Sequence, residues 1–144
     1  MERHQRAQRM LGWIALLGAT LQFFLAGLAV FRAKPHGTDK LFESSAFDAH
    51  RVVGDAMILV TFALLVLAIV NREQIRLAAL LFVLMLVQYG LAQAGDSVPA
   101  LGALHPVNGV AVLAISHFLA RGPGGTHGAA VEEPGPTVEE PAPG

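Results

Sequence analysis

Residues 50–70 read HRVVGDAMILVTFALLVLAIV: a His-x-Val-x-Gly motif, His50 to Gly54, followed by a long apolar run. The same motif recurs at His105 and Gly109, again at the start of an apolar run. In an α-helix, residues four positions apart lie on the same face, one turn along. Each copy therefore predicts a helix that presents an imidazole with a small gap beside it.

The apolar residues of this 144-residue chain are clustered in four long runs. They make up 53% of the sequence, and the mean hydropathy of +0.52 is high for a soluble domain. A helix of about 20 apolar residues is long enough to cross the hydrocarbon core of a bilayer. We therefore predict an all-α protein, a transmembrane four-helix bundle, with spans at residues 10–31, 52–70, 75–94 and 100–120.

The chain divides into a membrane part and a tail. Residues 1–121 are expected to form the four-span transmembrane bundle, after a short basic lead of residues 1–9. Residues 122–144 are rich in glycine, proline and glutamate and are expected to form a disordered cytoplasmic tail. The net charge of −1 offers no basic surface for nucleic acid, and the absence of cysteine excludes disulfides, thiolate ligands and iron–sulfur clusters.

Basic residues near the span ends predict the orientation of the bundle. Cytoplasmic flanks carry an excess of lysine and arginine, so both termini are expected in the cytoplasm, with the chain in the plasma (inner) membrane. Both histidine motifs then lie at the outer ends of their spans. The ten basic residues divide as Arg3, Arg6, Arg9, Arg72, Arg76 and Arg121 on the inner side, and Arg32, Lys34, Lys40 and Arg51 on the outer side.

The first and third spans also share a motif. Gln22 lies in Leu-Gln-Phe-Phe-Leu-Ala, and Gln88 lies in Val-Gln-Tyr-Gly-Leu-Ala. The chain therefore reads as two pseudo-repeated helical hairpins, each with glutamine on its first helix and histidine on its second. Repeats with an even number of spans are related by an axis along the membrane normal. Such an axis would place His50 opposite His105.

Two facing imidazoles predict a metal site. Histidine inside a span is costly and normally faces a partner, a cavity or a ligand. Neutral imidazoles on both sides can bind the iron of a b-type haem axially, so His50 and His105 are the expected metal ligands. Gly54 and Gly109 would leave room for the ring. The alternative is that the histidines hydrogen-bond across helices and bind nothing.

Other polar residues near the motifs have two interpretations each. Arg51 and Asp55, four residues apart, can form an ion pair at the membrane edge; alternatively, Arg51 lies near a haem propionate with Asp55 holding it. Gln22 and Gln88 are either interhelical hydrogen-bonding residues or haem contacts.

Further residues of the spans are expected to have structural roles. Asn108 is expected to bond a carbonyl freed by Pro106, and His117 is interpreted as interfacial, because it is 12 residues from His105 and on another face. Close helix packing is the expected role of four glycines, Gly12, Gly18, Gly27 and Gly90.

These motifs resemble one four-helix half of the haem A synthase family, which pairs glutamine-containing helices with His-Arg and Leu-His helices around a b-type haem. The matching positions are Gln22, His50-Arg51, Gln88 and Leu104-His105. The chain also looks like a member of a group of small uncharacterised four-span bacterial membrane proteins. The synthase has two such halves and a glutamate important to its oxidation chemistry. Here there is one half, and no expected span contains glutamate. The resemblance therefore implies the fold and a haem pocket, and not the synthase activity.

We therefore predict an integral membrane protein that binds one haem b near the outer leaflet, for electron transfer or for haem sensing and carriage. With both axial positions filled, no position is left for oxygen or substrate, so these roles are favoured over an enzyme. One alternative is a haem-free structural or assembly subunit of a membrane complex. Another is a small quinone-reacting oxidoreductase subunit, for which Asp55 and Tyr89 are the candidate residues. The expected partners are the lipid bilayer and a redox partner or larger membrane complex; the oligomeric state is not predicted.

Overall fold

The computed structural model describes residues 2–33, 44–95 and 97–122, and this part of the chain is built from four long helices and one short one. The long helices are α1 Glu2–Arg32, α2 Asp48–Asn71, α3 Ile75–Gly95 and α4 Pro99–Arg121, and the 3-10 helix η2, Ser45–Phe47, precedes α2. All four long helices are apolar and long enough to cross a membrane. The predicted all-α four-helix bundle is therefore confirmed, and the four spans indicate a multi-pass membrane protein. The predicted tail lies outside the described residues, except Gly122.

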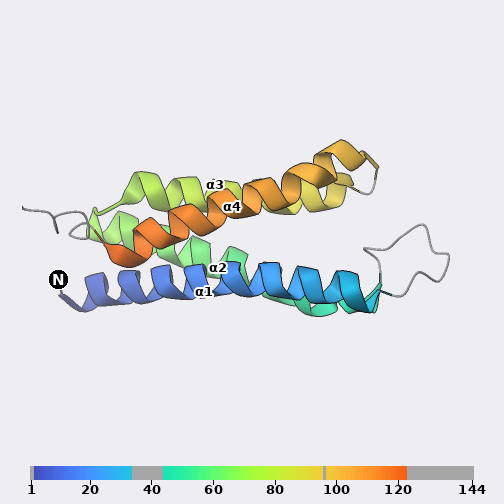
Figure 1. The fold of residues 1–144 in the computed structure, drawn as a ribbon. Helices are drawn as coiled ribbons and strands as arrows, with labels where there is room; N and C mark the ends of the chain where they lie inside the picture. The colour runs from blue at the N-terminus through green and yellow to red at the C-terminus, as the bar shows by residue number, and fades with distance from the viewer. Residues whose placement is uncertain (1, 34–43, 96, 123–144) are drawn as a thin grey trace, which may run out of the picture.

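The four helices run along one common axis, and each packs against two neighbours (Figure 1). Helix α1 contacts α2 and α4, and α3 contacts the same two helices. The start of α1, the turn at residues 72–74 and the end of α4 lie at one end of the bundle, which we call the terminal end. Helices α2 and α4 begin at the opposite end, which we call the histidine end. The basic lead of residues 2–9 is not a separate segment before the first span, because it forms the first turns of α1.

The buried positions repeat between the two hairpins at the register of the sequence motifs. Buried residues lie 10, 7 and 3 positions before Gln22 in α1 and before Gln88 in α3. Others lie 7, 11 and 14 positions after His50 in α2 and after His105 in α4. The paired core positions are Gly12 with Ala78, Ala15 with Leu81, Ala19 with Met85, Met57 with Val112, Thr61 with Ser116, and Leu64 with Leu119. The pseudo-repeated hairpins are therefore confirmed by which side chains the fold buries.

Glycine brings helices into backbone contact at the terminal end. A Cβ atom added to Gly12 in α1 would lie 2.8 Å from the backbone nitrogen of Ala120 in α4. One added to Gly18 would collide with the side chain of Met57 in α2. A Cβ at Gly27 or Gly90 would meet no atom of the described residues within 4 Å. The expectation of close helix packing is therefore correct for the first two glycines and wrong for the last two.

A polar network fastens α1 to the turn between α2 and α3. Gln8 is only 4% exposed; its Nε2 donates to the Glu73 carbonyl at 3.2 Å, and its Oε1 accepts from Asn71 Nδ2 at 2.7 Å. Gln5 Nε2 also donates to Glu73 Oε1 at 2.7 Å. Buried polar groups are stable only when they are hydrogen-bonded. The network therefore fixes where the first turns of α1 lie on the bundle.

Replacement of Gln8 by leucine is expected to lower the free energy of unfolding by about 1–3 kcal/mol, because it leaves the Asn71 amide and the Glu73 carbonyl without partners. The measurement is denaturant unfolding of the detergent-solubilised protein. Gln93→Leu is the matched control, since Gln93 is exposed on α3 and its replacement should change stability by less than about 0.5 kcal/mol. Equal changes in the free energy of unfolding for the two variants would show that the network does not stabilise the bundle.

Candidate functional site

The two motif histidines face each other across the bundle. The ring centroids of His50 in α2 and His105 in α4 are 6.1 Å apart, and the ring planes are inclined by 58°. Each ring also bonds to the glutamine of its own hairpin: His50 Nδ1 is 3.2 Å from the Gln22 carbonyl oxygen, and His105 Nδ1 is 3.1 Å from that of Gln88. A carbonyl oxygen can only accept, so Nδ1 is the donor in both bonds. In the neutral ring, Nε2 then carries a lone pair.

This geometry is compatible with a pair of metal ligands. Histidines that bind a metal through one ring nitrogen normally donate the other N–H to a carbonyl or carboxylate, which fixes the orientation of the ring. Metal–nitrogen bonds of about 2 Å on both sides would place two imidazole centres roughly 6 Å apart. No group of three or more histidine, cysteine, aspartate or glutamate side chains that could hold a metal ion occurs among the described residues. A metal held by this pair would therefore need its other ligands from a macrocycle such as a porphyrin.

The motif glycines lie against the motif glutamines. A Cβ atom at Gly54 would lie 2.9 Å from Gln22 Nε2, and one at Gly109 would lie 3.5 Å from Gln88 Nε2 and 3.2 Å from Phe23 Cζ. Each hairpin therefore brings its glutamine, histidine and glycine together, but the prediction of an open gap beside each glycine is wrong, because these side chains occupy it. Phe23 had not been expected at the site.

The polar bonding of the two halves differs. Gln88 Oε1 accepts a hydrogen bond from Asn108 Nδ2 at 2.6 Å, and the same amide donates to the Leu84 carbonyl at 2.9 Å. Asn108 therefore bonds to α3, so the prediction that it bonds a carbonyl freed by a proline in α4 is wrong. The first hairpin has Val53 at the corresponding position, and Gln22 Oε1 is buried without a hydrogen-bond partner. In the sequence, this difference is indicated by one position of the repeat. Three residues after the histidine, the first hairpin has valine and the second has asparagine.

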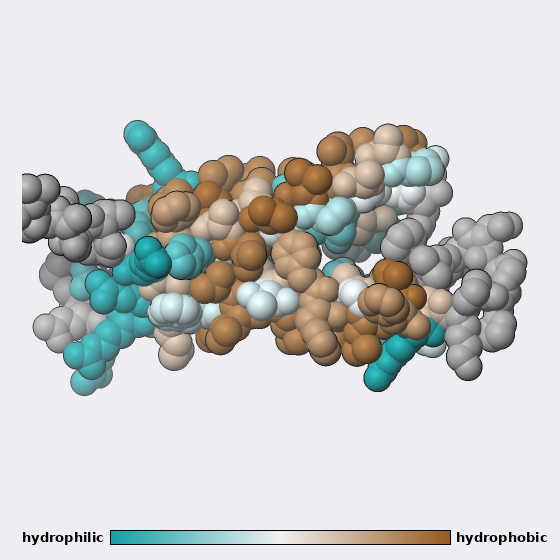
Figure 2. Space-filling view, in the orientation of Figure 1, coloured by the Kyte–Doolittle hydropathy of each residue, from teal (hydrophilic) through white to brown (hydrophobic). Residues whose placement is uncertain are grey.

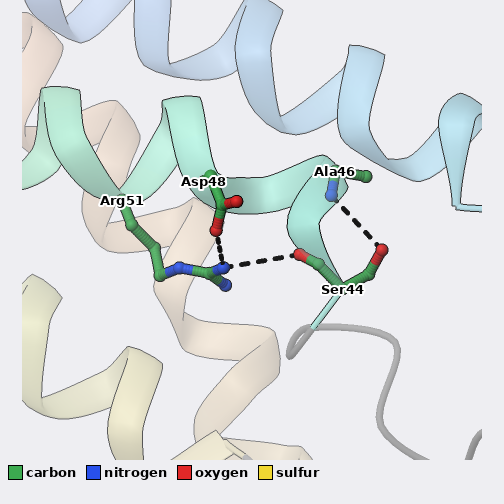
Figure 3. Close-up of polar contacts among 4 residues, drawn as sticks. All are labelled: Ser44, Ala46, Asp48 and Arg51. Carbon is green, nitrogen blue, oxygen red and sulfur yellow. Dashed lines mark hydrogen bonds and ion pairs between the residues drawn. The ribbon is translucent and has the colours of Figure 1, made fainter.

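Arg51 is anchored at the histidine end by an acidic neighbour (Figure 3). Its guanidinium forms an ion pair with Asp48 and donates to the Ser44 carbonyl at 3.4 Å. Ser44 Oγ in turn accepts from the Ala46 backbone N–H at 3.3 Å, at the start of η2. The predicted ion pair of Arg51 with Asp55 is therefore wrong: among the described residues, Arg51 pairs with Asp48. Asp55, the partner considered from the sequence, is exposed on α2.

An aromatic residue covers the His50 ring from the side of η2. Phe47 is buried, and its ring meets that of His50 edge-on, with centroids 6.4 Å apart and planes at 89°. Both histidines are half-buried. Tyr89, a candidate for reaction with quinones, is exposed on α3. The residues that the structure brings together at the site are therefore the histidine pair with its glutamines and glycines.

The comparisons with known proteins identify a family. The sequence pattern of the family of unknown function DUF6220 matches residues 22–95, which is just over half of the chain. The match begins at Gln22, includes His50 and Gln88, and ends before His105. No curated protein and no solved structure matches the chain. The resemblance to the haem A synthase family thus rests on the motifs alone. By its match over residues 22–95, the chain belongs to DUF6220.

Proposed function

We propose that the protein binds one b-type haem between His50 and His105 and works in electron transfer or in haem sensing and carriage. The observation that carries the proposal is the pair of imidazoles from different hairpins, 6.1 Å apart, each with Nδ1 held by a backbone carbonyl. When bound, the haem supplies an iron centre that takes up and gives back one electron. The donor set fits this group, because both imidazoles keep Nε2 free for a metal. The Gln22 amide lies 2.9 Å from a Cβ placed at Gly54, and Phe23 Cζ lies 3.2 Å from one placed at Gly109, so these side chains would have to move to admit the ring.

Each residue of the pair has a defined task in this proposal. His50 and His105 would hold the iron through Nε2, and the carbonyls of Gln22 and Gln88 fix the tautomer and orientation of the rings. Arg51, exposed at the histidine end and paired with Asp48, would be a cationic contact for a haem propionate at the rim of the site. Two protein ligands leave the metal no open position for substrate, which favours electron transfer or haem sensing and carriage over catalysis.

The proposed membrane orientation places the site in the outer half of the bilayer. Hydrophilic residues gather mainly at the terminal end, and apolar side chains cover the middle of the bundle (Figure 2). Gln22 follows Arg9 by 13 residues in α1, which corresponds to roughly 20 Å of helix. The hydrocarbon core is about 30 Å thick. With the arginine-rich terminal end in the cytoplasm, the histidine pair lies closer to the outer surface of the plasma membrane.

The test is spectroscopic. Protein expressed with ample haem and purified in detergent is expected to contain about one haem per chain, with the absorption spectrum of a six-coordinate low-spin iron. Haemin titration of haem-free protein should give the same spectrum. A protein that stays colourless in both experiments contradicts the proposal. If that colourless protein co-purifies with other membrane subunits, the haem-free assembly role is favoured.

A further inference from the structure

The gaps beside the two histidines are not equivalent. In the second hairpin, the ring of Phe23 covers Gly109, with Cζ 3.2 Å from the position of an added Cβ. Tyr89 is the counterpart of Phe23 in the repeat, and by symmetry it would cover Gly54. Among the described residues outside its own helix, only Gln22 Nε2 lies within 4 Å of a Cβ placed at Gly54. The gap beside His105 is therefore filled by an aromatic ring, whereas the gap beside His50 is occupied by one flexible amide, with Gln22 Nε2 2.9 Å from the added Cβ.

The amides that border the two gaps also differ in how firmly they are held. Gln88 is tied to Asn108 by a hydrogen bond of 2.6 Å, and it could move only by losing that bond. Gln22 Oε1 has no partner, and Val53 stands where the second hairpin has asparagine. The Gln22 amide can therefore shift aside without breaking a hydrogen bond. Both differences make the first half of the site the more yielding one, because a flexible amide without a hydrogen-bond partner borders it instead of a ring.

Symmetry gives this difference a consequence for the bound ligand. An axis that exchanges His50 and His105 lies in the plane of any ring held between them. A half-turn about this axis turns the ring over, so that each imidazole meets the opposite face. The two faces of protohaem are inequivalent, because vinyl and methyl groups alternate along its edge. A fully symmetric site would hold the two orientations in equal amounts, so any preference must come from differences between the halves.

We propose that this protein binds haem in one dominant facial orientation, with the bulkier edge groups placed beside Gly54, and that Phe23 is the residue that sets this orientation. The inference rests on the proposed haem-binding function. Its physical basis is steric: Phe23 is 40% exposed, but its ring already occupies the space beside Gly109, so a bulky edge group placed there would have to displace it.

The experiment is proton NMR of the ferric protein in detergent, with haemin as the ligand. Low-spin ferric haem shifts its ring-methyl signals out of the protein envelope, and each orientation gives its own set of signals. The wild type is expected to show one set in an excess of at least about five to one. Phe23→Ala should bring the two sets towards equal intensity, because it empties the gap beside Gly109. Tyr89→Ala is the matched control and should leave the ratio unchanged, since Tyr89 is exposed and covers neither glycine.

A second variant tests the same inference without touching Phe23. Val53→Asn gives Gln22 the partner that Asn108 gives Gln88, so it should also reduce the excess of the major set. Two signal sets of equal intensity in the wild type would overturn the inference and leave the haem proposal intact. An unequal ratio of the two sets that neither Phe23→Ala nor Val53→Asn changes would have the same meaning. The absence of any low-spin haem signal in the wild type would overturn both the inference and the proposed function.

Discussion

Replacement of His105 by alanine is expected to weaken haem binding by at least about 100-fold and to convert the remaining bound haem to a high-spin form. Loss of residues that merely orient a ligand lowers metal affinity by about 10–100-fold, so loss of the ligand itself should cost more. Because the two hairpins repeat, His50→Ala should behave in the same way, and the double variant should bind no haem at this site. Haemin titration followed by absorption, with electron paramagnetic resonance of the ferric iron, measures both effects.

His117 provides the control for this experiment. It lies on α4 twelve residues after His105, and its ring contacts that of Phe118. His117→Ala should leave both the affinity and the spin state unchanged. In a His105→Gly variant, imidazole added to the solution should restore the low-spin spectrum, because it can take the vacated axial position. Wild-type affinity in both single alanine variants would exclude the pair as axial ligands.

Replacement of Gly12 by alanine is expected to destabilise the bundle by about 1–3 kcal/mol, the usual cost of overpacking a dense interior. The added Cβ would lie 2.8 Å from the backbone nitrogen and 2.9 Å from the Cα of Ala120. Backbone atoms cannot rotate out of the way as a side chain can, so α1 and α4 would have to separate. Helix association in membranes depends on such close packing of small residues. Denaturant unfolding in detergent measures the loss, and Gly12→Leu should increase it further.

Gly27→Ala is the matched control on the same helix. No described atom lies within 4 Å of its added Cβ, and alanine favours a helix over glycine by up to about 1 kcal/mol. This variant should therefore be as stable as the wild type or slightly more stable. Similar stability of Gly12→Ala and Gly27→Ala would mean that the contact between α1 and α4 does not limit the stability of the bundle.

Much of the fold could be predicted from local sequence. The spans follow from runs of apolar residues, and the two hairpins follow from repeated Gln and His-x-Val-x-Gly motifs. The repeat axis also led to the expectation that His50 and His105 face each other, and their rings are 6.1 Å apart. Predictions about single contacts were less successful, and the partner of Asn108 is an example. Such contacts depend on the rotation of each helix about its own axis, which short motifs do not specify.

The sequence by itself determined the four spans and the placing of histidine and glycine on one face of a helix, because apolar length and helical spacing are local properties. Haem binding stays a prediction from these residues. Only the tertiary structure decided that the imidazole Nδ1 atoms bond to the backbone carbonyls of Gln22 and Gln88, and that Phe23 covers Gly109. These contacts join residues of different helices. The contact between Phe23 and Gly109 joins residues of different hairpins. Their distances are set by how closely small residues such as Gly12 let the helices approach, and no single helix carries that information.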